Sequence, residues 1–258
     1  MTKKIDLIVR SQSDVLLDRM LKSAKDTSDG DYGVLIEKDE ESSPRCASTY
    51  NRLASESDAD LLCFLHDDIE FLSKGWDRVA RELFLEYKPQ ILGVVGSKRY
   101  IGGRVFDSGA SFGAGHYCTQ VSGESVVKVF SRSSRYESVT VVDGMFMIVS
   151  RKFWQENPFD ETFDELFFYD LDLCLRAKNV GVTSSIFVKH SKPSNMFGVY
   201  PDTMKPITAY WDKFHQKHDL SPMSVGDQRC ACVKLADFEK YGQNGVLDGF
   251  LSKYGAVA

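Results

Sequence analysis

The first 97 residues alternate between apolar runs and amphipathic stretches, and this alternation limits the possible folds more than any other feature of the chain. Apolar runs of strand length lie at 4–10, 31–39, 59–68 and 90–97. The stretches between them carry apolar residues at helical spacing, at 14–25, 43–57 and 74–87. Strands that alternate with helices pair in parallel, so this order predicts an α/β fold with a central, mostly parallel sheet flanked by helices.

The remaining sequence predicts a small antiparallel part and a C-terminal extension. Residues 100–142 are rich in Gly and Ser and hold short alternating runs, which indicate loops and partly antiparallel strands. Beyond them we expect a strand that enters a helix, a helix that ends at Gly181 and a last strand, at 144–154, 166–181 and 183–190. The pattern therefore predicts one domain over 1–200 and a helical extension, packed on that domain, over 201–258.

Composition and charge argue against several classes of protein. The 258 residues include 32 basic and 37 acidic side chains, whereas non-specific binding to nucleic acid requires a basic surface. The six cysteines form no C-x-x-C pair, and Cys230 and Cys232 have no second pair at zinc-like spacing. The sequence shows no signal peptide and no apolar run of membrane-spanning length. These features predict a soluble, reduced, cytoplasmic protein.

Three polar residues interrupt an apolar run at the end of the third predicted strand. His66, Asp67 and Asp68 stand inside LLCFLHDDIEFL, and ligands of open parallel sheets bind beyond the carboxyl ends of the strands. Because successive residues of a strand point to opposite sides, His66 and Asp68 can face one site while Asp67 faces away. The pattern fits either a solvated turn or a site for a hard divalent cation.

A second cluster, FDETFDELFFYDLDLCLRA at 159–177, is rich in carboxylates. Asp170 lies at the expected start of a helix, and Asp172 can form an ion pair with Arg176 one turn later. A capped helix with a surface ion pair explains these residues. In the alternative explanation Asp170 faces the cleft as a general base, kept ionised by the helix N-terminus and by nearby cations.

A third cluster, FVKHSKPSNMFG at 187–198, includes the end of the last predicted strand. His190 ends that strand at the ligand-binding edge of the sheet, although a lone histidine is more often structural. Lys192, Ser194 and Asn195 follow it and are suitable donors to a phosphate group.

Taken in order, these segments resemble family 2 of the nucleotide-sugar glycosyltransferases, which have the GT-A fold. The resemblance rests on YNRLASESDADLLCFLHDDIEF, VDGMFMIVSRKFW, FDETFDELFFYDLDLCLRAKNVG and VKHS, which span about 50 to 198. It implies a metal-dependent, inverting transfer of a sugar from a nucleoside diphosphate sugar, with a UDP-sugar favoured, to a hydroxyl acceptor. It also implies a nucleotide-binding half at 1–98 and a catalytic, acceptor-binding half at 99–200.

The resemblance assigns metal ligands and a base. Asp68 matches the last Asp of the family's D-x-D motif, which binds Mn²⁺ or Mg²⁺ at the donor diphosphate, and His66 replaces the first Asp. His190 matches a later residue that often completes the metal shell, and Asp170 matches the catalytic base. Tyr169 stands where the family usually has Glu, which suggests a contact with the acceptor.

The same resemblance assigns residues around the donor. Arg10 and Ser11, followed by Gln12, come after the first strand and Asp39 after the second, where the base and ribose usually bind. The other residues that it implies near the nucleotide sugar are Asn51, Arg52, Asp67, Gly144 and Lys192.

Two other functions fit part of this pattern. A nucleotidyltransferase usually opens with a Gly-rich phosphate loop, but IVRSQSD at 8–14 contains no glycine. A non-catalytic module that binds a sugar nucleotide or a glycan is the second alternative, and His66 in the metal motif favours it.

The sequence does not identify the acceptor, which can be a glycan, a lipid-linked sugar, a protein or a modified base. Loops select such partners, so we expect acceptor choice to depend on 100–124 and on the C-terminal part. The aromatic and basic stretch WDKFHQKH at 211–218 fits a packed helix, an acceptor groove, or a weak contact with a membrane surface or another subunit.

Overall fold

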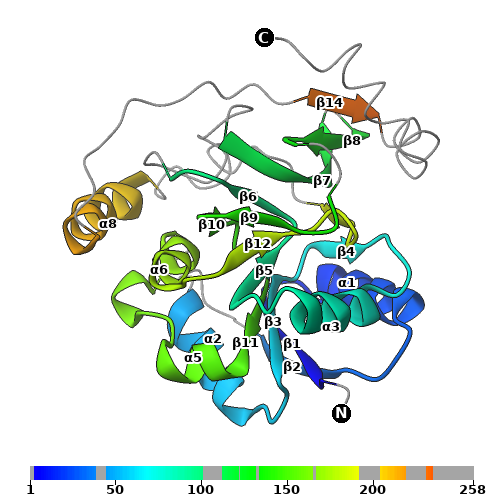
Figure 1. Ribbon diagram of the computed structural model, residues 1–258, viewed down its shortest axis with the longest axis horizontal. Coiled ribbons are helices and arrows are strands. Elements are labelled where there is room, and N and C mark those ends of the chain that lie inside the picture. Colours follow the sequence, from blue (N-terminus) through cyan, green and yellow to red (C-terminus); the bar gives the residue numbers. More distant parts are fainter. Residues whose placement is uncertain are drawn as a thin grey trace.

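The computed structural model of the protein describes residues 3–38, 45–100, 112–121, 123–131, 134–164, 167–191, 204–218 and 231–234. Within this part of the chain, strands form two sheets of seven strands each, and helices cover the central sheet on both sides (Figure 1).

The central sheet has seven strands in the order β2-β1-β3-β11-β5-β12-β9. Their bounds are β1 Ile5–Ser11, β2 Gly33–Lys38, β3 Leu61–His66, β5 Ile91–Gly93, β9 Glu137–Val139, β11 Phe146–Ser150 and β12 Val180–Val182. β1 pairs in parallel with β2 and β3, and β12 pairs in parallel with β5. Because β11 and β9 are the two reversed strands among these seven, the predicted mostly parallel sheet is confirmed.

Helices cover both faces of this sheet. In Figure 1, α1 (Asp14–Thr27) and α3 (Trp76–Glu86) lie on one side. The other side carries α2 (Cys46–Glu56), α5 (Arg151–Glu156) and α6 (Tyr169–Arg176).

The side chains of β3 explain why a helical layer forms on each face of the sheet. Its alternate residues Leu61, Cys63 and Leu65 belong to one buried cluster, and Leu62 and Phe64 belong to the other.

The second sheet is mostly antiparallel, as the sequence predicts for its middle part. Its order is β10-β6-β7-β13-β4, with β8 on β7 and β14 on β8. The strands are β4 Ile69–Phe71, β6 Val95–Ser97, β7 Gly113–Val121, β8 Glu124–Val129, β10 Val141–Val142, β13 Val188–His190 and β14 Ala231–Lys234. The single strand expected at 90–97 is thus divided, because β5 joins one sheet and β6 joins the other.

Two predicted elements differ from the structure. The helix expected at 166–181 ends at Arg176, and Gly181 lies in β12, where a Cβ atom would come within 2.2 Å of the Tyr136 ring. Strand pairing with β5 and β9 therefore replaces the last turn of that helix. The C-terminal extension is not purely helical, since β14 adds a strand to the second sheet.

The described part of the extension packs on the domain through α8 (Met204–Lys217). Phe214 on α8 is fully buried, and its ring centroid lies 5.8 Å from that of Phe163 and 4.8 Å from that of Phe168. Phe163 belongs to a short 3₁₀ helix, η2 (Glu161–Phe163), and Phe168 directly precedes α6. The stretch at 211–218 is thus a packed helix with one wet face.

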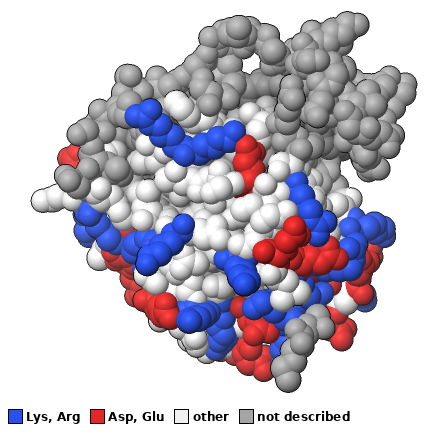
Figure 2. Space-filling view, in the orientation of Figure 1, with Lys and Arg blue, Asp and Glu red and all other residues white. Residues whose placement is uncertain are grey.

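Charges are mixed on the visible surface. On the face in Figure 2, Lys and Arg alternate with Asp and Glu over the described residues of the lower half, without a large area of one sign. Within the described residues, no helix has both the length and the apolar composition that a membrane crossing requires.

Truncation of Phe214 tests the packing of α8. Phe214→Ala removes a fully buried ring, and such a loss costs about 3–5 kcal/mol of unfolding free energy. The exposed neighbour on the same helix, Gln216→Ala, serves as the control and should change little. Denaturant unfolding of both variants checks this. Equal midpoints for the two variants would contradict the docking of α8.

Candidate active site

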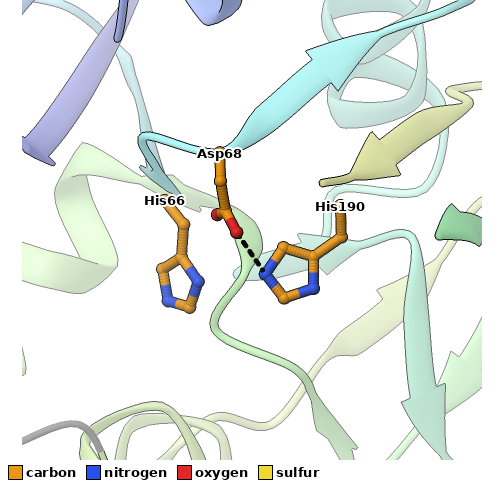
Figure 3. Close-up of side chains that lie close together, drawn as sticks. All are labelled: His66, Asp68 and His190. Carbon is orange, nitrogen blue, oxygen red and sulfur yellow. Dashed lines mark ion pairs between the residues drawn. The ribbon is translucent and has the colours of Figure 1, made fainter. Parts of the chain in front are cut away.

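Three potential metal ligands meet at the carboxyl end of β3 (Figure 3). His66 ends β3, Asp68 lies in the turn from β3 to β4, and His190 ends β13. β13 pairs with β4 so that His190 stands opposite Ile69, which brings it beside Asp68. The ligand atoms of the three side chains lie within 4.8 Å of one another, and 3.2 Å separates Asp68 Oδ2 from His190 Nε2.

The turn that carries the two aspartates is buried. Asp67 is 4% exposed and Asp68 is 2% exposed, so a solvated turn does not describe this segment. A buried carboxylate requires hydrogen bonds or an opposite charge. For Asp68 the neighbouring imidazole of His190 supplies such a partner.

Asp67 points to a different part of the protein. Its Oδ2 accepts hydrogen bonds from Ser11 Oγ at 3.1 Å and from the Gln12 backbone N–H at 3.0 Å. Asp67 therefore joins the loop after β1 to the turn after β3. Ser13 ends this loop as the N-cap of α1 and accepts from Leu16 N–H.

Asp170 lies in the first turn of α6. Its Oδ2 accepts from the Gly144 N–H at 2.8 Å and its Oδ1 from the Leu171 N–H at 2.9 Å. The predicted capping role is wrong, because Phe168 occupies the N-cap position with a φ of 72°. The sequence also predicts nearby cations that keep Asp170 ionised, but cations are not the main influence on its pKa. Burial, and then the negative charge of Asp143, raise the pKa of Asp170 to about 7.

Asp143 is a residue that sequence reasoning passed over. It follows β10, and its Oδ1 accepts from the Met145 N–H at 2.9 Å. Successive backbone N–H groups, at 144 and 145, thus hold the carboxylates of Asp170 and Asp143. Asp143 directly precedes Gly144, which the resemblance assigns to the site, and this position could have indicated it from the sequence.

Tyr169 joins the cluster of His66, Asp68 and His190 to the segment that holds the carboxylate of Asp170. Its hydroxyl lies 3.3 Å from His66 Nε2 and 3.5 Å from the Gly144 carbonyl oxygen. The side chain is 1% exposed, so it offers little surface for the suggested contact with an acceptor. Gly144 must remain small here, because a Cβ atom would lie 2.4 Å from the Tyr169 hydroxyl oxygen.

Arg10 and Ser11 end β1 next to the cluster. Arg10 stands opposite His66 in the parallel register, so both side chains point to the same face of the sheet. The guanidinium of Arg10 is largely buried and lies close to Cys46 at the start of α2. Burial raises the pKa of the Cys46 thiol to about 12 in spite of that positive charge.

Two residues expected near the donor have structural partners instead. Asn51 Oδ1 accepts from Trp154 Nε1 and Phe159 N, and its Nδ2 donates to the Phe159 carbonyl at 2.9 Å and to Glu161. Both ends of this amide therefore fasten α2 to α5 and to the segment that follows it.

Arg52 forms ion pairs with Glu37 on β2 and with Glu56 one turn along α2. Neither partner belongs to the cluster at the end of β3. Two further expected donor residues, Asp39 and Lys192, lie outside the described residues.

Asp172 connects α6 to α8. The expected ion pair with Arg176 is present at 2.9 Å, and Lys217 Nζ and His218 Nε2 approach the other oxygen at 2.6 and 2.8 Å. Burial alone would raise the pKa of Asp172, but the hydrogen bonds from His218 and Lys217 outweigh it and leave that pKa lowered. Asp172 is thus a structural anchor.

Comparison with known proteins gives a family match. A family model described as Glycosyltransferase like family matches residues 29–217. A comparison with curated protein sequences gave no match.

Solved structures with this fold include a protein of S. aureus. TarS 1-349 of S. aureus, in complex with UDP-GlcNAc, has a TM-score of 0.54 and 12% identity over 85% of this chain and 68% of that one. A second structure of S. aureus TarS has a TM-score of 0.52 and 13% identity over 85% of this chain, which spans 41% of that one. These similarities confirm the GT-A-like fold. Since the family model covers well over half of the sequence, the chain belongs to the family 2-like glycosyltransferases.

Proposed function

We propose that this protein transfers a sugar from a nucleoside diphosphate sugar, with UDP as the favoured nucleotide, to a hydroxyl acceptor with inversion at the anomeric carbon. One observation carries the proposal. The cluster of His66, Asp68 and His190 is joined to the carboxylate of Asp170 through the Tyr169 hydroxyl and the backbone of Gly144. Family membership favours this reaction over nucleotidyl transfer, and S. aureus TarS was solved with UDP-GlcNAc.

The chemistry of the cluster fits a divalent cation. Imidazole nitrogens and carboxylate oxygens are metal ligands, and an ion with bonds of about 2.1 Å can share two ligand atoms that lie 3.2 Å apart. The residues proposed to hold Mn²⁺ or Mg²⁺ are His66, Asp68 and His190. A cation bound there would neutralise negative charge that develops on the departing diphosphate.

Arg10, Ser11 and Asp67 are the described residues proposed around the nucleotide. Arg10 offers a cation on the same face of the sheet as His66. Asp67 holds Ser11 and the loop after β1 in place, so that loop can present a preformed surface to the base and ribose. Asp39 and Lys192 stay predictions for the same site. Asn51 and Arg52 have structural partners and are not part of the proposal.

Asp170 is the proposed general base. Two backbone N–H groups fix its orientation, and part of its surface remains accessible. The acceptor hydroxyl gives its proton to Asp170 while its oxygen bonds to the anomeric carbon. At the same time the bond from that carbon to the diphosphate oxygen breaks, and the electron pair leaves with the diphosphate. A single displacement on the opposite face inverts the anomeric centre.

The two halves of the domain are proposed to divide the substrates between them. Residues 1–98 would bind the nucleotide, and 99–200 would supply the base and contact the acceptor. β11, from the second half, lies between β3 and β5 of the first, so the halves share one sheet. Acceptor choice is proposed to depend on 100–124 and on the C-terminal part, much of which lies outside the described residues.

A donor screen tests the proposed substrate class. The protein is mixed with a panel of nucleoside diphosphate sugars and Mn²⁺, and donor hydrolysis and thermal stabilisation are measured. We expect a UDP-sugar to give the largest stabilisation, because binding to the folded state raises its stability. A protein that hydrolyses and binds none of the donors would refute the transferase, and binding without turnover would favour the non-catalytic module.

Asp170→Asn tests the base. An amide cannot take the acceptor proton, so kcat should fall by about 10²–10⁴ while donor binding is kept. Asp160→Asn in the same acidic segment is the control. Asp160 forms an ion pair with Lys217, so its substitution should leave kcat unchanged. Near-full transfer activity of Asp170→Asn would show that another group is the base.

The pH dependence of kcat/KM tests the environment of Asp170. The base must be ionised, and because its pKa is raised to about 7, activity should rise with pH through that value. Asp143→Asn removes a negative charge that favours the protonated form, so the acid limb should move to lower pH. If the acid limbs of the two pH profiles coincide, the charge of Asp143 does not raise the pKa of Asp170.

A further inference from the structure

The C-terminal helix α8 contacts both ends of the helical turn that carries Asp170. This turn runs from Phe168 to Asp172 and is closed by the Asp172 backbone N–H, which donates to the Phe168 carbonyl at 2.8 Å. At its first end, the Phe214 ring of α8 stacks on Phe168, with 4.8 Å between the ring centroids. Figure 1 shows α8 next to α6. Because Asp170 lies in the middle of the turn, its position depends on how both ends are held.

Charge holds the second end of the turn. The side chain of Asp172 is fully buried, and its Oδ1 lies 2.6 Å from Lys217 Nζ and 2.8 Å from His218 Nε2. Hydrogen bonds to a buried carboxylate from charged donors are strong, so they fasten the end of α8 to α6. Lys217 also pairs with Asp160, which lies outside the turn, so substitution of Asp160 leaves the contacts to Asp172 in place.

Phe168 has a backbone conformation that side chains rarely adopt. Its φ is 72°, in the left-handed region, where the Cβ atom of a residue other than glycine crowds the following carbonyl oxygen. Such a conformation persists where the surrounding structure enforces it. The Phe168 side chain is 5% exposed and packs against the rings of Phe214 and Phe163. Its contact with α8 therefore helps to hold the left-handed backbone in place.

The backbone at Phe168 directs the two side chains that follow it. The Tyr169 hydroxyl lies 3.5 Å from the Gly144 carbonyl oxygen, and Asp170 Oδ2 accepts from the Gly144 N–H at 2.8 Å. Both residues thus meet the same glycine. A rotation of the backbone at Phe168 would displace both of them together. Misplacement of a reacting group by about 1 Å can cost about 100-fold in rate, so this backbone is important for catalysis.

We propose that α8 is a clamp that positions the general base. Phe214 holds Phe168 in its left-handed conformation, the charged end of α8 holds Asp172, and the turn between these contacts presents Asp170 to the acceptor. This inference rests on the proposed function, which makes Asp170 the base. It gives the C-terminal part a role in the transfer step that is separate from the choice of acceptor. Phe168 and Phe214 are positioning residues, because they act on the reaction through Asp170.

Phe214→Ala and Phe214→Leu test the clamp by separating kcat from KM. Alanine leaves the Phe168 ring without its stacking partner, so kcat per folded molecule should fall by about 10–100-fold. The KM for the donor should stay the same, because the nucleotide is proposed to bind to 1–98. Leucine fills much of the space and should restore most of kcat. Circular dichroism measures the folded fraction.

Gln216→Ala, at an exposed position of the same helix, is the control and should leave both parameters unchanged. An unchanged kcat in folded Phe214→Ala would overturn the clamp. So would equal losses of kcat in the alanine and leucine variants, since the effect would then not follow the packing.

Phe168→Gly and Phe168→Ala form a matched pair that remains available if Phe214→Ala does not fold. Both remove the same ring, but glycine accepts a φ of 72° and alanine does not. The left-handed backbone costs alanine a factor of about 5–30 in population, so Phe168→Gly should keep a kcat at least about fivefold higher. Equal values of kcat would show that the backbone at this position does not set the position of the base.

Amide hydrogen exchange of Gly144 separates the clamp from the proposed function, because it requires no turnover. The Gly144 N–H donates to Asp170, so displacement of the turn should free it. We expect its exchange to become at least about tenfold faster in Phe214→Ala and to stay unchanged in Gln216→Ala. An unchanged rate in Phe214→Ala would refute the clamp even if the donor screen confirms the transferase. Faster exchange together with a failed donor screen would overturn the proposed function and leave the clamp on Asp170 supported.

Discussion

The antiparallel pairing of β11 with β3 is the contact on which the candidate site depends. The backbone N–H of His66 donates to the Met145 carbonyl at 3.1 Å, which holds the segment before β11 against the end of β3. In the same segment, the N–H groups of Gly144 and Met145 bind the carboxylates of Asp170 and Asp143. A single pairing between distant parts of the chain thus places the metal-ligand cluster close to the proposed base.

Helical geometry gives two aspartates of α6 opposite roles. Residues two apart on a helix point to different sides, so Asp170 faces the segment before β11 while Asp172 faces α8. Burial, and then the negative charge of Asp143, raise the pKa of Asp170 to about 7, which suits proton transfer near neutral pH. Asp172 instead meets Lys217 and His218, and its pKa is lowered. One short helix therefore separates the carboxylate proposed as the base from a structural one.

The buried hydroxyl of Tyr169 connects these parts of the site. It lies within hydrogen-bond distance of His66 in the cluster with Asp68 and His190, and of the carbonyl of Gly144, whose N–H binds Asp170. Its ring packs between Tyr50 and Phe159, which keeps the hydroxyl away from solvent and in a fixed position. A glutamate at this position would place a charge where the structure has a neutral aromatic side chain. The tyrosine is consistent with a cluster that contains imidazoles, since its neutral hydroxyl can hydrogen-bond to His66 Nε2, 3.3 Å away, without adding charge.

The sequence by itself determined the α/β class, most of the helices, and the polar residues His66, Asp68 and His190 at strand ends. Apolar periodicity and chain order are local properties, and they can be read without knowledge of strand partners. Only the tertiary structure decided that β11 enters the sheet in reverse, that the run 90–97 serves two sheets, and that Asn51 has a structural role. It also decided that Asp143 stands beside Asp170 and that Tyr169 points inward. These features depend on which distant strands and side chains pack together, because burial of both faces of the sheet selects partners that no local pattern records.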